Sequence, residues 1–147
     1  MKLSFANLNK DGLSGATVDG NALIFSCVKP LIIQPAEIQK VQIGLELRIP
    51  EGFVLNISTH PKLIDKAGEI FPALLALDHT HSGEVLIPVR NNGRNQLSLA
   101  PGMVLARGYL TRIEELELDT MSPMGKSSGE LPRTQPQKKN PFSFEVK

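Results

Sequence analysis

The side chains best suited to chemistry lie in two parts of the sequence. Asp78, His79 and His81 follow one another closely, and His60 lies earlier in the chain. A carboxylate can serve as a general base, and imidazole and carboxylate groups together are ligands that zinc accepts. His79 and His81 are two residues apart, so they would face the same side of a strand. The alternative, a polar loop whose histidines are solvated or hydrogen-bonded, is the interpretation we favour, and we predict no metal site.

Two other features that resemble reactive sites have simpler explanations. The chain has one cysteine, Cys27, which excludes an intrachain disulfide and a cysteine-based zinc site. It lies in the strand-like run LIFSCV, where a cysteine usually serves as a small buried apolar residue. The segment MGKSSG, residues 124–129, lacks the first glycine of a phosphate-binding loop, so we interpret it as a linker.

Short strands are the elements that must position these side chains. Eleven prolines and twelve glycines leave few windows in which helical periodicity could develop. Apolar residues alternate with polar ones in four segments separated by turn residues, which predicts an all-β sandwich, barrel or jelly roll. Pro88 lacks a backbone donor, so we expect it at a sheet edge or at a bulge. The alternating residues are Ile43, Leu45, Leu47 and Ile49; Phe53, Leu55 and Ile57; Val85, Ile87 and Val89; and Leu97 and Leu99.

Two further segments have weaker helical patterns. Residues 60–68, HPKLIDKAG, could form about two helical turns, with Pro61 at the first helical position. Residues 111–118, TRIEELEL, fit either a continued strand or a brief helix. Neither segment is long enough to change the fold class.

The composition changes near Asp119 and divides the chain into two predicted parts. Residues 1–118 form a β domain, and residues 119–147 are rich in proline and polar residues, as in a non-globular arm. The arm ends in NPFSFEVK, in which apolar residues alternate as in a strand. We predict that this strand joins a sheet edge of a neighbouring subunit or partner. The alternative is a disordered tail whose last residues touch their own domain. The predicted contact residues are Phe142, Phe144 and Val146.

The overall composition excludes several classes of protein. The formal net charge is +1, too small to indicate binding to nucleic acid or to a membrane. The longest apolar runs fall far short of the ~20 residues that a membrane-spanning helix needs. The first residues, MKLSFANLNKDG, contain no apolar segment typical of a secretory signal. We therefore expect a soluble, intracellular protein.

Three segments together carry a resemblance to a known family. IGLELRIPEGF, LDHTHSGEV and SLAPGMVLARG are similar to the framework of the dUTPase/dCTP deaminase superfamily, over roughly residues 20–113. The resemblance implies a dUTPase-like distorted jelly roll that forms a homotrimer. It also implies active sites at the subunit junctions, with a C-terminal arm that closes over the site of a neighbour.

Part of the chemistry of this family is retained. Asp78 matches the carboxylate that activates water, and Gly83 and Glu84 keep the turn that follows it. Thr80 stands where the family has a second acid, and His81 replaces a tyrosine that packs against deoxyribose. As a hydrolase the chain would use Asp78 with Mg²⁺, and no other cofactor is expected.

The phosphate-binding motifs are altered more strongly. Ala22 replaces an aspartate of the first motif, and in the second, at residues 59–62, Lys62 alone keeps a positive charge. Arg107 replaces a phosphate-handling glutamine of the fourth motif. The MGKSSG segment offers no aromatic residue to stack on a base. If a nucleotide binds, we expect Lys62, His81 and Arg107 to contact it.

These losses decide the predicted function. A base without a phosphate clamp loses the positioning term, which is worth up to ~7–11 kcal/mol in favourable cases. We therefore predict a non-catalytic trimer with a structural role, most specifically a decoration or cement protein of a viral (phage) capsid shell, present in the virion. The alternative is a divergent dUTP or dCTP hydrolase, or a nucleotide-binding protein, that uses Asp78.

Overall fold

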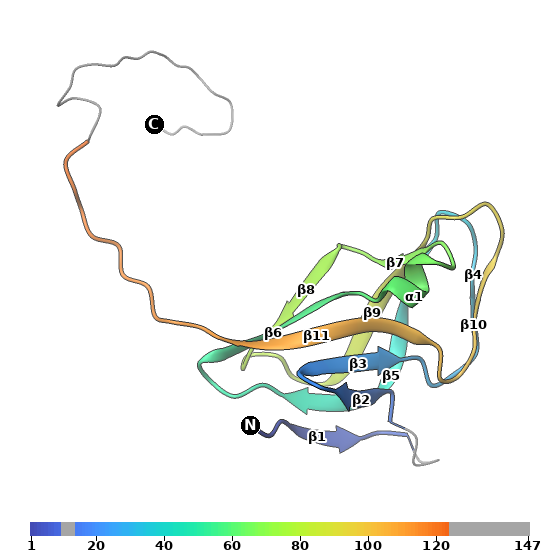
Figure 1. The fold of residues 1–147 in the computed structure, drawn as a ribbon, viewed down its shortest axis with the longest axis horizontal. Helices are drawn as coiled ribbons and strands as arrows, with labels where there is room; N and C mark the ends of the chain where they lie inside the picture. The colour runs from blue at the N-terminus through green and yellow to red at the C-terminus, as the bar shows by residue number, and fades with distance from the viewer. Residues whose placement is uncertain (10–13, 124–147) are drawn as a thin grey trace. The chain divides into compact units, whose positions relative to one another are not determined.

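The protein is built almost entirely of short antiparallel strands, which confirms the predicted all-β class. The computed structural model describes residues 1–9 and 14–123 (Figure 1). The chain divides into two units, residues 1–114 and 115–147, and every described element lies in the first. The elements are β1 (Ser4–Asn7), β2 (Ala16–Asp19), β3 (Ala22–Ser26), β4 (Leu31–Ile33), β5 (Ile38–Arg48), β6 (Phe53–Thr59), α1 (Pro61–Ile64), β7 (Gly68–Ile70), β8 (Leu74–Leu77), β9 (Glu84–Asn91), β10 (Leu97–Leu99) and β11 (Val104–Arg112).

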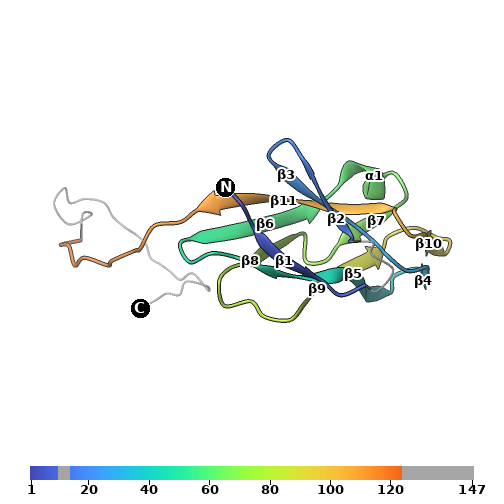
Figure 2. The ribbon, with the colours of Figure 1, turned by 90° about the horizontal axis from the view of Figure 1, so that it is seen from below.

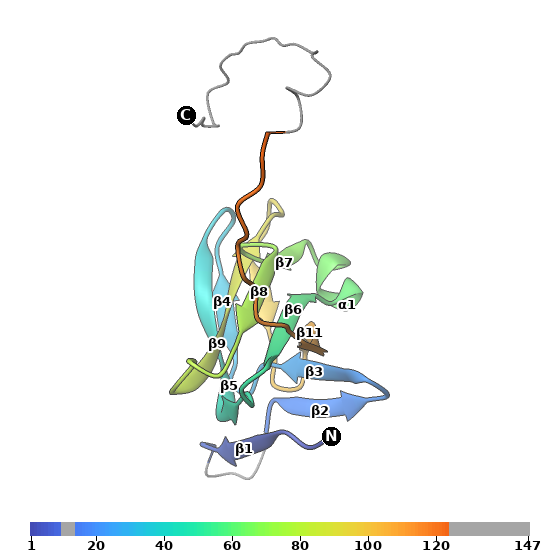
Figure 3. The ribbon, with the colours of Figure 1, turned by 90° about the vertical axis from the view of Figure 1, so that its left-hand side faces the viewer.

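Two antiparallel sheets form the body of the first unit. One has four strands in the order β1-β5-β9-β7, and the other has five in the order β2-β3-β11-β6-β8. A small third sheet pairs β4 with β10. The two larger sheets lie one over the other, and their edge strands β1 and β2 are neighbours in both views (Figures 2 and 3).

The core lies between these sheets and is made by the residues that alternate in the sequence. Burying a leucine or isoleucine side chain contributes ~1.5–3 kcal/mol, so the shared interior holds the two sheets together. Phe53 is an exception, because it is only partly buried and packs against the core from its margin. The buried residues that the alternation predicted are Ile43, Leu45, Leu47, Ile49, Leu55, Ile57, Val85, Ile87, Val89, Leu97 and Leu99.

Pro88 lies in an inner strand, so the prediction of an edge or a bulge was wrong. β9 pairs with β5 on one side, where Pro88 stands opposite Lys40, and with β7 on the other. The Pro88 carbonyl accepts a hydrogen bond from Phe71 N–H at 3.0 Å, just where β7 ends. In an antiparallel strand the N–H and C=O of one residue point to the same side. The missing donor of Pro88 therefore faces the end of β7, and the sheet loses only the last bond of that ladder.

The structure also settles the two segments with helical patterns. α1 begins at Pro61, the predicted first helical position, but it ends at Ile64 and is shorter than the two turns expected. β11 continues the strand pattern as far as Arg112. Residues 113–123 form neither helix nor strand, so the alternative of a brief helix at 111–118 was wrong.

The C-terminal arm is described only as far as Pro123. Leu116 and Leu118, just before its predicted start, are 92% and 104% exposed. The contact of the arm with a neighbouring subunit stays a prediction, because Phe142, Phe144 and Val146 lie outside the described residues. Within the described ranges, no helix has the length and apolar character needed to cross a membrane.

Candidate functional site

A group of positively charged residues begins with Arg107, on the outward face of the five-stranded sheet. Arg107 on β11 stands opposite Ser58 on β6 and Ile24 on β3. Its neighbours along the strand, Ala106 and Gly108, are buried. Because side chains alternate along a strand, the Arg107 side chain lies on the face away from the core. The strand register therefore places Arg107 on the central strand of this sheet, beside the end of β6.

The start of α1 adds the second part of the group. His60 N–H donates to the Leu105 carbonyl at 3.0 Å, which ties the end of β6 to β11 just before Arg107. His60 is the N-cap residue of α1, and its Nδ1 accepts a hydrogen bond from Lys62 N–H at 3.1 Å. Lys62 is exposed on the single turn of this helix. We call His60, Lys62 and Arg107 the cationic cluster.

The charges of the cationic cluster act on His60. Its pKa lies below the ordinary value because the imidazole is partly desolvated, and because the positive charges of Arg107 and Lys62 disfavour a further proton. Asp19, at the end of β2, opposes this shift more weakly. His60 is therefore neutral near pH 7, and the charge of the cluster comes from Arg107 and Lys62.

Arg107 lacks a hydrogen-bond acceptor in the part of the chain that the structure describes. Its Nε atom is buried and unpaired there. Buried polar atoms in proteins nearly always have a partner, so an unpaired guanidinium nitrogen points to a ligand or a neighbouring molecule. The planar guanidinium group suits a phosphate or carboxylate, which it can bind through two parallel hydrogen bonds.

Asp78 lies in a separate loop that directly follows β8. Its Oδ1 accepts hydrogen bonds from the Thr80 hydroxyl at 2.5 Å and from Thr80 N–H at 2.9 Å. The Asp78 carbonyl accepts another, from His81 N–H at 3.0 Å. The two Thr80 bonds hold the pKa of Asp78 below its ordinary value, so the carboxylate is ionised near neutral pH. Oδ2 has no donor among the described residues and can accept a hydrogen bond from water.

Asp78 and the cationic cluster lie at opposite ends of β6. β8 pairs with β6 so that Leu77 stands opposite Leu55, and Asp78 therefore follows beside Val54. His60 lies six residues beyond Val54, about 20 Å away at ~3.3 Å per residue. One chain therefore does not bring the predicted base together with Lys62 and Arg107, the predicted phosphate-binding residues.

The histidines considered for a metal site are divided in the same way. His79 and His81 lie in the Asp78 loop, whereas His60 lies at the far end of β6. No three potential metal ligands gather among residues 1–9 and 14–123. His81 Nε2 is buried without a hydrogen-bond partner in these residues, and its contact with a nucleotide stays a prediction.

Cys27 is buried, as predicted, and is only 1% exposed. Its thiol donates a hydrogen bond to the Ala100 carbonyl. Burial raises the pKa of the thiol above its ordinary value. A protonated, enclosed thiol is a poor nucleophile, so Cys27 takes no part in a reaction.

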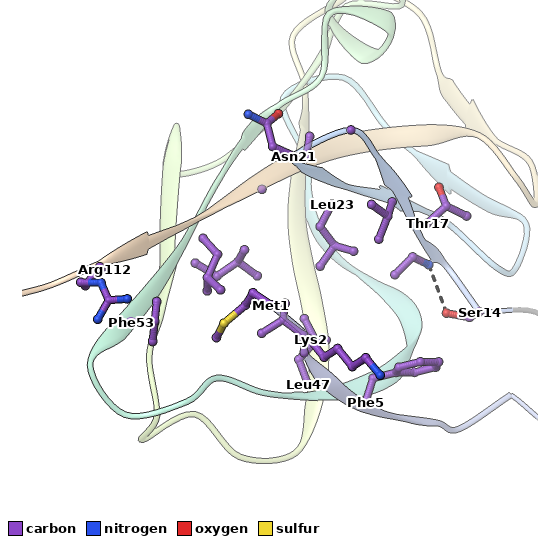
Figure 4. Close-up of a pocket in the computed structure, with 18 residues that line it drawn as sticks. Met1, Lys2, Phe5, Ser14, Thr17, Asn21, Leu23, Leu47, Phe53 and Arg112 are labelled. Atoms are coloured by element: carbon purple, nitrogen blue, oxygen red, sulfur yellow. Dashed lines mark hydrogen bonds between the residues drawn. The ribbon is translucent and has the colours of Figure 1, made fainter.

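An apolar groove of about 750 Å³ was not foreseen from the sequence (Figure 4). It lies between β1 and β2, the edge strands of the two sheets, and Figure 4 shows Leu23, Leu47 and Phe53 around it. Lys2 and Arg112 also line it, and the Arg112 guanidinium carbon lies 5.1 Å from the centre of the Phe53 ring. Among the residues that the structure describes, no carboxylate, imidazole or thiol lines the groove, so these residues are suited to binding and not to acid–base chemistry.

Known proteins that are similar to this chain are nucleotide hydrolases. A deoxyuridine 5′-triphosphate nucleotidohydrolase of Gloeothece citriformis is 27% identical over 135 residues, covering 88% of this chain and 93% of the relative. The protein of that name from Chlamydia trachomatis is 26% identical over 106 residues, covering 71% and 70%. A solved mutant dUTPase from phage phi11 of Staphylococcus aureus has a TM-score of 0.73 at 14% identity, covering 84% of this chain and 99% of that one. No family model matches the chain.

These similarities confirm the predicted dUTPase-like jelly roll and correct the predicted function. The role as a capsid decoration or cement protein is wrong, because the relatives are named for hydrolysis of dUTP. Residues 59–62 differ from the second phosphate-binding motif of the superfamily, and from this difference we predicted that the phosphate-binding site is lost. The fold instead gathers Lys62 and Arg107, from distant parts of the sequence, at one end of β6.

Proposed function

Because the chain is a dUTPase-like member of the dUTPase/dCTP deaminase superfamily, we propose that it is a divergent nucleotide hydrolase of the dUTP diphosphatase type. Water attacks the α-phosphorus of a deoxynucleoside triphosphate, the bond to the β-phosphate breaks, and pyrophosphate and a nucleoside monophosphate leave. The proton of the water passes to Asp78. The buried, unpaired Nε of Arg107, beside Lys62 and His60, is the observation that carries this proposal.

The cationic cluster is the proposed phosphate-binding site. Arg107 supplies a planar donor group that binds two phosphate oxygens at once. Lys62, exposed on α1, supplies a charge on a flexible stem that can follow the outer phosphates. α1 has only four residues, so its dipole adds little and the side chains provide the attraction.

Asp78 is the proposed base, acting on a nucleotide held by a neighbouring copy of the chain. Its free Oδ2 accepts a hydrogen bond from the attacking water, while Thr80 fixes Oδ1. The separation of about 20 Å from His60 is too large for one chain to complete the site. A homotrimer with sites between subunits removes this difficulty, and it brings His81 toward the nucleoside.

The apolar groove also supports self-association. It runs between β1 and β2, and each of these strands has a free edge in its sheet. Free edges and apolar surface are both unfavourable in water, and a second copy that covers them removes both. Phe5 and Val18, which line the groove, are 60% and 76% exposed in the single chain.

Mg²⁺ enters this proposal together with the substrate. Triphosphate oxygens are ligands that Mg²⁺ prefers, and the ion usually needs few protein ligands beside them. Three metal-binding side chains do not come together in the described ranges. The chain thus fits a metal carried by the triphosphate, where Mg²⁺ would neutralise charge on the phosphates.

The proposal is tested by measuring pyrophosphate release from dUTP and dCTP with Mg²⁺. We expect release by the natural protein and none by Asp78→Asn, whose amide oxygen can still accept the Thr80 hydrogen bonds but is not a base. If a folded sample binds a non-hydrolysable dUTP analogue without turnover, the chain is a nucleotide-binding protein. If a folded sample shows no turnover and no binding of the analogue, the proposal is refuted.

A further inference from the structure

The two ring nitrogens of His60 have different environments. Nδ1 accepts the hydrogen bond from Lys62 N–H at 3.1 Å. A nitrogen that accepts a hydrogen bond carries no hydrogen, so the neutral ring bears its hydrogen on Nε2. In the described part of the chain Nε2 has no hydrogen-bond partner, and it is not among the buried unpaired atoms. Its hydrogen is therefore available to a ligand.

The backbone around His60 is held firmly. His60 N–H donates to the Leu105 carbonyl at 3.0 Å, and the His60 carbonyl accepts from Leu63 N–H at 2.9 Å. Leu63 is fully buried and anchors α1 in the core. The backbone of His60 is thus fixed by β11 on one side and by α1 on the other, and the Lys62 hydrogen bond orients the ring.

Three charged groups from three elements act on the His60 ring. Arg107 comes from β11, Lys62 from α1 and Asp19 from β2, and the two cations outweigh the one carboxylate. A proton added at Nδ1 would remove the acceptor of Lys62 N–H and would place a third positive charge in the cluster. The cap of α1 and a charged His60 are therefore mutually exclusive.

We propose that His60 is an anion-binding residue that acts as a neutral donor through Nε2–H, beside the two permanent cations Lys62 and Arg107. This inference rests on the proposed function, which supplies the anion as the phosphates of a nucleotide. The site then presents two positive charges and one neutral donor throughout the neutral pH range. Its contact with phosphate does not depend on protonation of a histidine.

The tautomer of His60 can be read directly by nitrogen NMR of the imidazole rings in the full chain. We expect Nε2 to carry the hydrogen in the free protein at pH 7.5. Addition of inorganic tripolyphosphate should shift the Nε2 resonance and leave Nδ1 unprotonated. A hydrogen on Nδ1 in the free protein, or protonation of Nδ1 on binding, would overturn the inference.

A matched variant separates the donor from the cap. Asn is a good N-cap residue, so His60→Asn keeps an acceptor for Lys62 N–H and cannot titrate, while the Nε2–H donor is replaced by a shorter amide that does not reach as far. We expect this variant to bind tripolyphosphate roughly fivefold more weakly, the worth of one neutral hydrogen bond. The ratio of the two affinities should stay constant from pH 6.5 to 8, because the titration of the phosphate is common to both proteins.

The outcomes distinguish failure of this inference from failure of the proposed function. If the natural protein binds tripolyphosphate and His60→Asn binds it equally well, His60 is only a cap and this inference is wrong. A ratio that grows as the pH falls would show a cationic His60 and would also refute it. If the natural protein binds no tripolyphosphate at millimolar concentration, the phosphate site itself is wrong, and both proposals fall.

Discussion

The cationic cluster and the Asp78 loop lie at opposite ends of one strand, β6, and they are completed in different ways. The Asp78 carboxylate is held by two hydrogen bonds from Thr80, two residues away. Arg107 is held by the register of β11 with β3 and β6, and its Nε has no partner within the described ranges. The acid is therefore arranged by its own loop, whereas the cations need something from outside. This contrast is what we expect if, as proposed, phosphate binds at the cluster and the acid comes from another copy of the chain.

The largest effect should be the loss of pyrophosphate release when either Asp78 or Arg107 is removed. Asp78→Ala and Arg107→Ala should each lose roughly 10³-fold or more in the rate of pyrophosphate release. If each site combines a cluster from one subunit with an acid from the next, a mixed trimer from equal amounts of both variants restores some sites. If the two variants assemble at random, about a quarter of the sites have both natural residues.

Subunit exchange followed by the pyrophosphate assay checks this expectation. The two variants differ in mass, so native mass spectrometry of the mixture counts the mixed trimers and fixes how completely the subunits exchange. Exchange without recovery in the mixture of the two inactive variants would show that acid and cations act within one chain, and the comparison between the regions would fail.

The next largest effect should be the loss of affinity for tripolyphosphate, measured without turnover, when the Arg107 guanidinium is removed. A hydrogen bond between charged groups is worth ~1.5–3 kcal/mol, so Arg107→Ala should weaken tripolyphosphate binding roughly 10- to 100-fold. Arg107→Lys keeps the charge without the planar donor group, so its affinity should lie between those of the natural protein and of Arg107→Ala. Calorimetric titration gives the affinities. Unchanged affinity in Arg107→Ala would place the phosphates elsewhere.

Loss of the Thr80 hydroxyl should have a smaller effect, confined to the acid. Thr80→Val removes the strongest of the interactions that depress the pKa of Asp78, so this pKa should rise toward its ordinary value. The acidic limb of the pH–rate profile should move to higher pH, because a base with a raised pKa becomes protonated earlier as the pH falls. Thr80→Ser keeps the hydroxyl and should retain the natural profile. Identical pH–rate profiles for all three proteins would show that the Thr80 hydroxyl does not act on the pKa of the catalytic base.

The smallest effect should be a change in stability with pH that arises at the cluster. The pKa of His60 is lower in the folded chain than its ordinary value of 6.5, so the unfolded chain binds more protons just below that pH. This contribution to stability is present above pH 6.5 and is lost as the pH falls. Chemical denaturation from pH 5 to 8 should show it in the natural protein. A curve of the same slope for His60→Asn would assign the loss to other groups.

The sequence predicted the elements well where the chain pattern alone decides the outcome. Alternation in residues 43–49 predicted the buried face of β5, because one face of a strand in a sandwich must be apolar. Pro61 correctly marked the start of α1, since its missing donor is not needed at that position. Pro88 was misplaced, because the pattern does not reveal where the neighbouring β7 ends.

The candidate site was harder to predict, because it depends on which strands become neighbours. Lys62 and Arg107 could be named from the resemblance, but only the pairing of β6 with β11 places them together. The distance of Asp78 from them follows from the pairing of β8 with β6, which no local pattern contains. The groove between β1 and β2 depends likewise on which strands end up at the sheet edges.

The burial of Cys27 has a practical consequence for measuring motion in this protein. Since it is the only cysteine of the chain and is 1% exposed, it should react with a thiol reagent only when the core opens. The rate of its modification therefore reports the opening of the sandwich without any engineered probe. A cysteine introduced at an exposed position would react far faster, so one reagent can time local access and global opening in the same molecule.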